Sequence, residues 1–177
     1  GADIITLGSD SDTVTTGSAA DTILTTTGNL NLNDTISGGA GTDVLQLTTD
    51  GSTVIDADFT NVTSVETLTT SADAQLTSAT LGTLAAAAGI VTVTMADTSA
   101  ADTLTLAAGM TNNVTVNLPT DAAAGNTVTA TNYTKVLTVA ADATDLDSNA
   151  STITGGTGTA DELQVTGSAA LTVILTS

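Results

Sequence analysis

The clearest structural signal in this chain is the stretch Gly38-Gly39-Ala40-Gly41-Thr42-Asp43-Val44-Leu45-Gln46. It joins a glycine-rich segment to an aspartate, and an aliphatic residue, Leu45, follows two positions later. Glycine tolerates the positive φ angles of tight turns, and an aliphatic residue flanked by outward-facing neighbours is typical of a strand with one buried face. The stretch therefore predicts a turn followed by a short β-strand.

The pairing of an aspartate with an aliphatic residue recurs toward the N-terminus. The aspartates lie nine residues apart, apart from one interval of thirteen, and they are Asp3, Asp12, Asp21, Asp34 and Asp43. The aliphatic residues that follow them by two positions are Ile5, Val14, Ile23, Ile36 and Leu45. Two nine-residue units make a rung of about eighteen residues in a β-solenoid. We therefore expect Asp3, Asp21 and Asp43 on one edge and Asp12 and Asp34 on the other.

Such an edge brings negative charges close together. Equivalent turns of successive rungs stack at about 4.8 Å, and carboxylates at that spacing repel unless a cation lies between them. Carboxylate and carbonyl oxygens are the ligands that calcium prefers. The sequence therefore predicts calcium at the stacked turns.

The 38–46 stretch also resembles a known family. It matches, position by position, the Gly-Gly-x-Gly-x-Asp-x-aliphatic-x nonapeptide of RTX calcium-binding repeat proteins. The resemblance covers residues 1–47, where the earlier copies lack most glycines, and it returns at residues 155–163 with one extra residue before Asp161. The Thr- and Ala-rich residues between are similar in composition to bacterial S-layer proteins and large RTX adhesins.

This resemblance implies an all-β fold, a right-handed parallel β-solenoid of the β-roll or β-helix kind, with several Ca²⁺ ions. In the family, the metal lies between successive turns of one edge, held by aspartates and turn carbonyls. The expected metal-binding residues here are Asp3, Asp10, Asp12, Asp21, Asp34, Gly38, Gly39, Gly41, Asp43, Asp145, Asp147 and Asp161.

Asp145 and Asp147 are candidates for a different reason. With Asn149 they form the D-x-D-x-N opening of a calcium loop, but Ala150 stands where an EF-hand has glycine, and no glutamate follows at the twelfth position. A calcium site and a simple turn both remain open there. Asp56 and Asp58 are weaker candidates of the same kind.

Composition excludes several classes of function. The chain has 177 residues and a formal net charge of −18, with one basic residue, Lys135, and no Cys or His. Nucleic-acid binding needs a basic surface, and zinc sites, thiol chemistry and Ser-His catalysis need residues that are absent. No apolar run is long enough to span a membrane. A mean hydropathy of +0.31 is too high for a disordered acidic tail, so we expect the chain to fold.

The remaining residues predict further strands. Short alternating runs at 91–95, 103–106, 114–118, 127–129, 136–139, 152–154 and 171–175 have period two and β-branched residues. Leu81–Gly89 is the sole helix-like stretch. We expect one continuous solenoid of about nine rungs, with 18–20 residues per rung. Its parts would be an RTX-like β-roll at 1–50, a Thr/Ala-rich continuation at 51–150 and a second glycine-containing part at 151–177. Because it opens in mid-repeat, we expect a segment of a longer protein.

The expected function is structural. We expect a calcium-stabilised segment of a bacterial S-layer or surface fibre, type I secreted and extracellular, that folds and self-associates on binding calcium. The alternative is a spacer or ligand-binding module of a giant RTX adhesin, and surface polysaccharide stays open as a partner. Two minor alternatives remain. Recurrent Thr-x-Thr pairs are compatible with an ice-binding face, although Thr is also simply a good polar residue for the outer face of a strand. Paired carboxylates such as Asp56 and Asp58 are compatible with a polysaccharide-acting enzyme, but the near-absence of Arg, Lys and aromatic residues argues against any enzyme.

Overall fold

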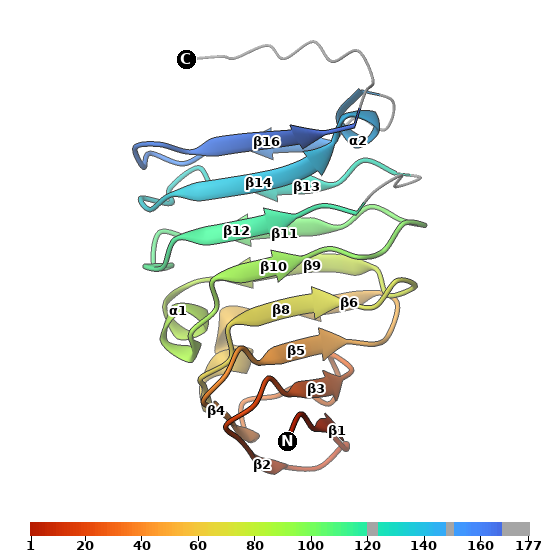
Figure 1. The fold of residues 1–177 in the computed structure, drawn as a ribbon, viewed down its shortest axis with the longest axis vertical. Helices are drawn as coiled ribbons and strands as arrows, with labels where there is room; N and C mark the ends of the chain where they lie inside the picture. Colours follow the sequence, from red (N-terminus) through yellow and green to blue (C-terminus); the bar gives the residue numbers. More distant parts are fainter. Residues whose placement is uncertain (120–123, 148–150, 168–177) are drawn as a thin grey trace.

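The computed structural model is a stack of parallel β-strands (Figure 1), and it describes residues 1–119, 124–147 and 151–167. The main sheet has eight strands, in the order β1 (Ile4–Thr6), β3 (Thr22–Thr25), β5 (Val44–Leu47), β8 (Thr67–Thr70), β10 (Thr92–Thr94), β12 (Val114–Asn117), β14 (Leu137–Asp142) and β16 (Glu162–Thr166). Every pairing between them is parallel, and each connection passes through a strand of another sheet or a loop.

Two smaller sheets complete the turns. One has three strands, β2 (Thr13–Gly17), β4 (Thr35–Gly39) and β7 (Val62–Thr63). The other has five, β6 (Ser52–Val54), β9 (Leu76–Leu81), β11 (Thr103–Leu106), β13 (Thr127–Thr129) and β15 (Thr152–Thr154). The predicted parallel β-solenoid is therefore confirmed. The predicted strand at 171–175 lies outside the described residues.

The rungs are longer than the sequence repeat suggested. Ile4 pairs with Thr22, a step of 18 residues, but Thr22 pairs with Val44, and Thr67 with Thr92, which are steps of 22 and 25. The expectation of nine rungs with 18–20 residues each is wrong. The extra residues form longer loops, such as the one that contains the buried Leu30. In the third turn they add β6 and a short 3₁₀ helix before β7, which continues the β2–β4 sheet.

Within the described residues, three short helices lie among the connections. The 3₁₀ helix η1 (Asp56–Phe59) packs against α1 (Thr83–Ala88), and α2 (Ala143–Asp147) follows β14. The helix predicted at Leu81–Gly89 is confirmed, and Gly89 ends it with φ +110°. The expectation that it is the sole helix is wrong, because η1 and α2 are single turns too short to produce a helical period in the sequence.

The core is a narrow column of aliphatic side chains. Of the five registered positions, Ile23, Ile36 and Leu45 are fully buried, and Ile5 and Val14 are partly buried at the first turns. The two aromatic residues, Phe59 and Tyr133, are buried as well. The alternation of burial along the strands follows from the two-residue period of side chains in a β-strand.

Candidate cation-binding turns

Acidic side chains form a ladder along one edge of the main sheet. The backbone N–H of Asp3 donates to Asp21 Oδ1 at 2.7 Å, and that of Asp21 donates to Asp43 Oδ1 at 2.8 Å. The N–H of Asp43 donates to Glu66 Oε2 at 2.8 Å. Asp3, Asp21 and Asp43 thus share an edge, as the spacing indicated. Glu66 is a further member, which the sequence reasoning missed although Leu68 follows it by two positions, as the aliphatic residues follow the aspartates.

Asp12 and Asp34 form a second ladder on the opposite edge. The N–H of Asp12 donates to Asp34 Oδ1 at 2.9 Å. Each side chain also closes its own turn: Asp12 Oδ2 accepts from Gly8 N at 2.7 Å, and Asp34 Oδ2 accepts from Asn31 N at 2.8 Å. Both oxygens of Asp34 are therefore occupied by backbone donors.

Asp21 and Asp43 differ in having an unpartnered oxygen. Their exposed fractions are 1% and 0%, and the Oδ2 atom of each is buried without a hydrogen-bond donor among the described residues. The N–H of Asp3, which donates to Oδ1, is the main cause that lowers the pKa of Asp21, against the effect of its burial. Asp21 is therefore ionised at neutral pH. A buried anionic oxygen without a donor is costly, and a cation would remove that cost.

The glycines of the 38–43 turn are required by close stacking. A Cβ on Gly38 would clash with the carbonyl of Ser64 and would lie 2.6 Å from Asp43 Oδ2. Gly39 and Gly41 have φ angles of +88° and +148° and approach the carbonyls of Gly17 and Ala19 in the turn before. Stacking by itself thus explains all three glycines. It also brings the Ser64 carbonyl and Asp43 Oδ2 to the same side of Gly38.

The fit of these turns to a calcium ion depends on those carbonyls. Within the described ranges, no three His, Cys, Asp or Glu side chains converge on one point. Each turn supplies one carboxylate, so Asp21 and Asp43 would hold an ion only together with turn carbonyls or water. Calcium takes six to eight oxygens of these mixed kinds. The oxygen ligands that the turns offer are therefore of the kind that calcium binds, although few of them are carboxylates.

The C-terminal glycine-containing turn uses its aspartate differently. Asp161 is exposed, and its two oxygens accept from Leu137 N at 3.0 Å and from Gly156 N at 2.9 Å. The extra residue that interrupts the motif, Ala160, adopts φ +79°. Asp161 thus occupies a ladder position between turns, but both of its oxygens already have backbone donors.

The other candidate residues, apart from Asp3, do not gather with the ladder. Asp3 belongs to the ladder, but its side chain is exposed. Asp10 is exposed and lines a shallow groove with Asn31 and Asn33. Asp145 is buried in α2, which ends at Asp147, so this part of the supposed loop or turn is helical. The side chain of Asp147 and residues 148–150 lie outside the described part of the chain.

Asp56 and Asp58 have structural partners. Asp56 accepts from the backbone N–H groups of Gly82, Leu84 and Ala85 at 2.8 to 3.1 Å, so it caps α1 from the preceding turn of the solenoid. Asp58 Oδ2 accepts from Ile55 N at 2.9 Å, and its burial raises its pKa.

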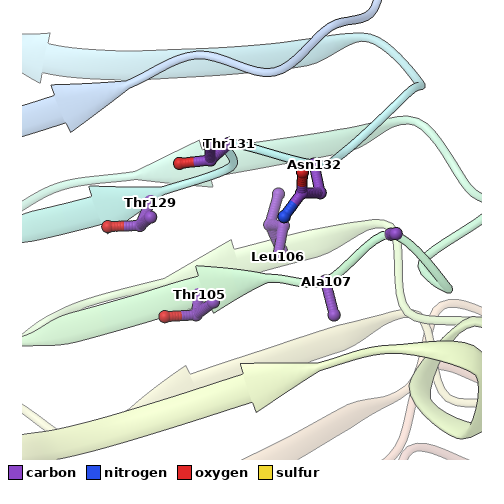
Figure 2. Close-up of a pocket in the computed structure, with 7 residues that line it drawn as sticks. Thr105, Leu106, Ala107, Thr129, Thr131 and Asn132 are labelled. Carbon is purple, nitrogen blue, oxygen red and sulfur yellow. The ribbon is translucent and has the colours of Figure 1, made fainter.

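Threonines form ordered rows on the five-stranded sheet. Thr103, Thr127 and Thr152 pair in register, and Thr80, Thr105, Thr129 and Thr154 form a second row two residues along. Figure 2 shows the hydroxyls of Thr105, Thr129 and Thr131 pointing to one side of an open cleft, with Asn132 turned toward Leu106. Other Thr-x-Thr pairs, such as Thr92 and Thr94, lie on the main sheet.

No family model, curated protein or solved structure matches this chain. Among the described residues, the helices are all too short to cross a lipid bilayer.

Proposed function

We propose that this chain is a calcium-stabilised structural segment of an extracellular bacterial surface layer or fibre. The observation that carries the proposal is the buried, unpartnered Oδ2 atom on both Asp21 and Asp43, two successive members of one ladder. An ion bound there would bridge neighbouring turns and neutralise charge that the chain cannot neutralise itself, because Lys135 is its one basic residue.

The mechanism is folding coupled to metal binding. A net charge of −18 opposes compaction, and the stacked turns that would bind an ion exist in the folded state alone. A ligand that binds the folded state stabilises it by about 2.7 kcal/mol per site at a hundredfold excess over its dissociation constant. Calcium-poor cytosol would therefore favour the unfolded, exportable chain, and calcium-rich surroundings the solenoid.

The test is a calcium titration from EGTA to the millimolar range, followed by circular dichroism and light scattering, with magnesium as the control ion. Calcium should increase β-structure or raise the melting temperature. Asp21→Asn and Asp43→Asn should weaken this response at least tenfold in calcium concentration. Asp73→Asn removes the same charge from an exposed site and should leave the response unchanged.

The scattering measurement distinguishes the two structural roles. Growth of particles with calcium supports a layer or fibre, whereas a calcium-dependent monomer supports a spacer module of a large adhesin. A solenoid that is equally stable in EGTA and in calcium would overturn the proposal. The acidic ladder would then serve only to accept backbone hydrogen bonds in the turns.

A second candidate function rests on the threonine rows. Two registered rows of hydroxyls on a flat parallel sheet present a regular array, which suits a periodic ligand such as ice. Thr129→Tyr should then abolish inhibition of ice recrystallisation, while Thr138→Tyr on the main sheet should not. A wild-type chain without inhibition would dismiss this function.

A further inference from the structure

The turn between β10 and β11 buries two further acidic side chains. Asp97 and Asp102 lie near its two ends, and the exposed fraction of each is 0%. Neither belongs to the glycine-rich motif, and the segment 95–102 contains no glycine. Two aspartates fully enclosed within eight residues of chain are unusual, because aspartate is almost never fully buried unless it has a partner.

In each of these two carboxylates, one oxygen accepts hydrogen bonds and the other does not. Asp97 Oδ1 accepts from the backbone N–H and the hydroxyl of Ser99, both at 2.8 Å. Asp102 Oδ1 accepts from Leu76 N at 2.7 Å. The Oδ2 atom of each is buried and has no donor among the described residues. Two unpartnered carboxylate oxygens are thus enclosed in one turn.

The charges of the two groups act on each other. Burial raises the pKa of Asp102 to about 7, against the effect of its bond from Leu76, and the negative charge of Asp97 raises it further. The chain has no means to neutralise the pair, because Lys135 is exposed in another turn. The compensating positive charge therefore has to be a bound cation or a proton shared by the pair.

We infer that the turn 95–102 binds one divalent metal ion of the calcium class through the free oxygens of Asp97 and Asp102. Hard cations of this kind prefer oxygen ligands, and a carboxylate can bind one through a single oxygen while the other accepts a hydrogen bond. The site would lie in a turn separate from the Asp21–Asp43 ladder, so the inference does not depend on the function proposed above.

The neighbouring turn shows that asparagine can occupy the position of Asp102. Thr103 pairs with Thr127, so Asn126 occupies the position equivalent to Asp102, and its Oδ1 accepts from Asp102 N at 2.8 Å. Asparagine therefore fits this ladder position in the stack, with its Nδ2 atom buried and without an acceptor among the described residues. Asp97→Asn and Asp102→Asn should fold while losing the charges that an ion needs.

The experiment counts calcium bound to the full chain by equilibrium dialysis at pH 7.5, with circular dichroism to establish folding. The Asp97→Asn/Asp102→Asn variant should bind one ion fewer than the wild type, and Asp73→Asn should bind the same number. Asp21→Asn/Asp43→Asn should still bind the ion at 95–102. A wild-type chain that binds ions but loses none in the Asp97/Asp102 variant would overturn this inference and leave the ladder proposal standing.

Urea unfolding in EGTA and in calcium, between pH 5 and 8, tests the competing explanation that the pair shares a proton. The folded state would then carry a proton that the unfolded chain lacks between pH 3.8 and about 7, so stability would rise as the pH falls through that range. Such a rise, equal in EGTA and in calcium, would refute a metal ion. A calcium-dependent increase in stability at pH 8 that Asp102→Asn removes would support one.

Discussion

At the scale of single residues, backbone contact between successive turns decides which amino acids are allowed. Gly38 and Gly17 stand at comparable turns, yet a Cβ on Gly38 would clash with the Ser64 carbonyl, whereas a Cβ on Gly17 would meet nothing within 4 Å. The motif glycine is thus needed where a neighbouring turn presses against it, and not at every turn.

Gly38→Ala should therefore destabilise the folded state by about 2 to 3 kcal/mol, because the backbone of either turn must shift. Gly17→Ala should leave stability within about 1 kcal/mol of the wild type, since its main effect is on the unfolded chain. Chemical denaturation in calcium measures both. Equal losses in the two variants would contradict the role of stacking.

Tyr133 gives a second prediction at this scale. Its hydroxyl is buried, donates to the carbonyls of Asn112 and Val136, and has its pKa raised to about 12 by burial. Tyr133→Phe should cost about 1 to 2 kcal/mol of unfolding free energy, because buried acceptors lose their donor. The loss should be constant from pH 6 to 9 in urea titrations, since the phenol stays protonated throughout. A loss that changed with pH in this range would contradict the assignment.

At the scale of elements, α1 depends on a residue of another turn. Gly82, the residue before the helix, has no side chain to cap it, and Asp56 accepts the first N–H groups from 26 to 29 residues away. This contact joins η1 to α1 and fixes the helix on the solenoid. A six-residue helix with four consecutive alanines would not form alone.

Asp56→Ala should unfold α1 locally and cost about 1 to 2 kcal/mol, the usual loss for a helix cap. Hydrogen exchange should show faster exchange of the amides of Gly82, Leu84 and Ala85, with β12 and β14 unaffected. Asp73→Ala is the matched control, because it removes a charge that touches no helix. Unchanged exchange at these amides would mean that packing against η1, and not the carboxylate, holds the helix.

At the scale of the whole molecule, charge is the dominant feature. A formal charge of −18 on 177 residues is concentrated at turn edges, where the acidic side chains stack. Self-repulsion of this size opposes folding, and salt screens it over a Debye length of about 10 Å at 0.1 M.

Raising KCl from 20 to 500 mM in EGTA should therefore raise the melting temperature by several degrees. If the chain binds calcium as proposed, the same change should have less effect in saturating calcium, because bound ions would reduce the net charge. Thermal unfolding followed by circular dichroism measures both cases. A melting temperature that is independent of salt in EGTA would show that the charges are too far apart to oppose folding.

The class of the fold and the order of the first acidic ladder could be predicted from the sequence. The nine-residue spacing placed Asp3, Asp21 and Asp43 on one edge, and the two-residue alternation placed Ile23, Ile36 and Leu45 in the core, because both follow from local strand geometry. Contacts between turns could not be predicted in this way, because they depend on the lengths of loops, which follow no sequence repeat.

The tertiary structure alone decided the rest. It set the rung at 22 to 25 residues after the first, added Glu66 to the ladder, turned Asp56 into a cap and enclosed Asp97 with Asp102. Each of these joins residues about 22 to 29 positions apart or depends on burial between rungs. A local pattern of aspartates indicates where turns occur, but the neighbouring turn determines whether a carboxylate oxygen meets an N–H group or is buried without a donor.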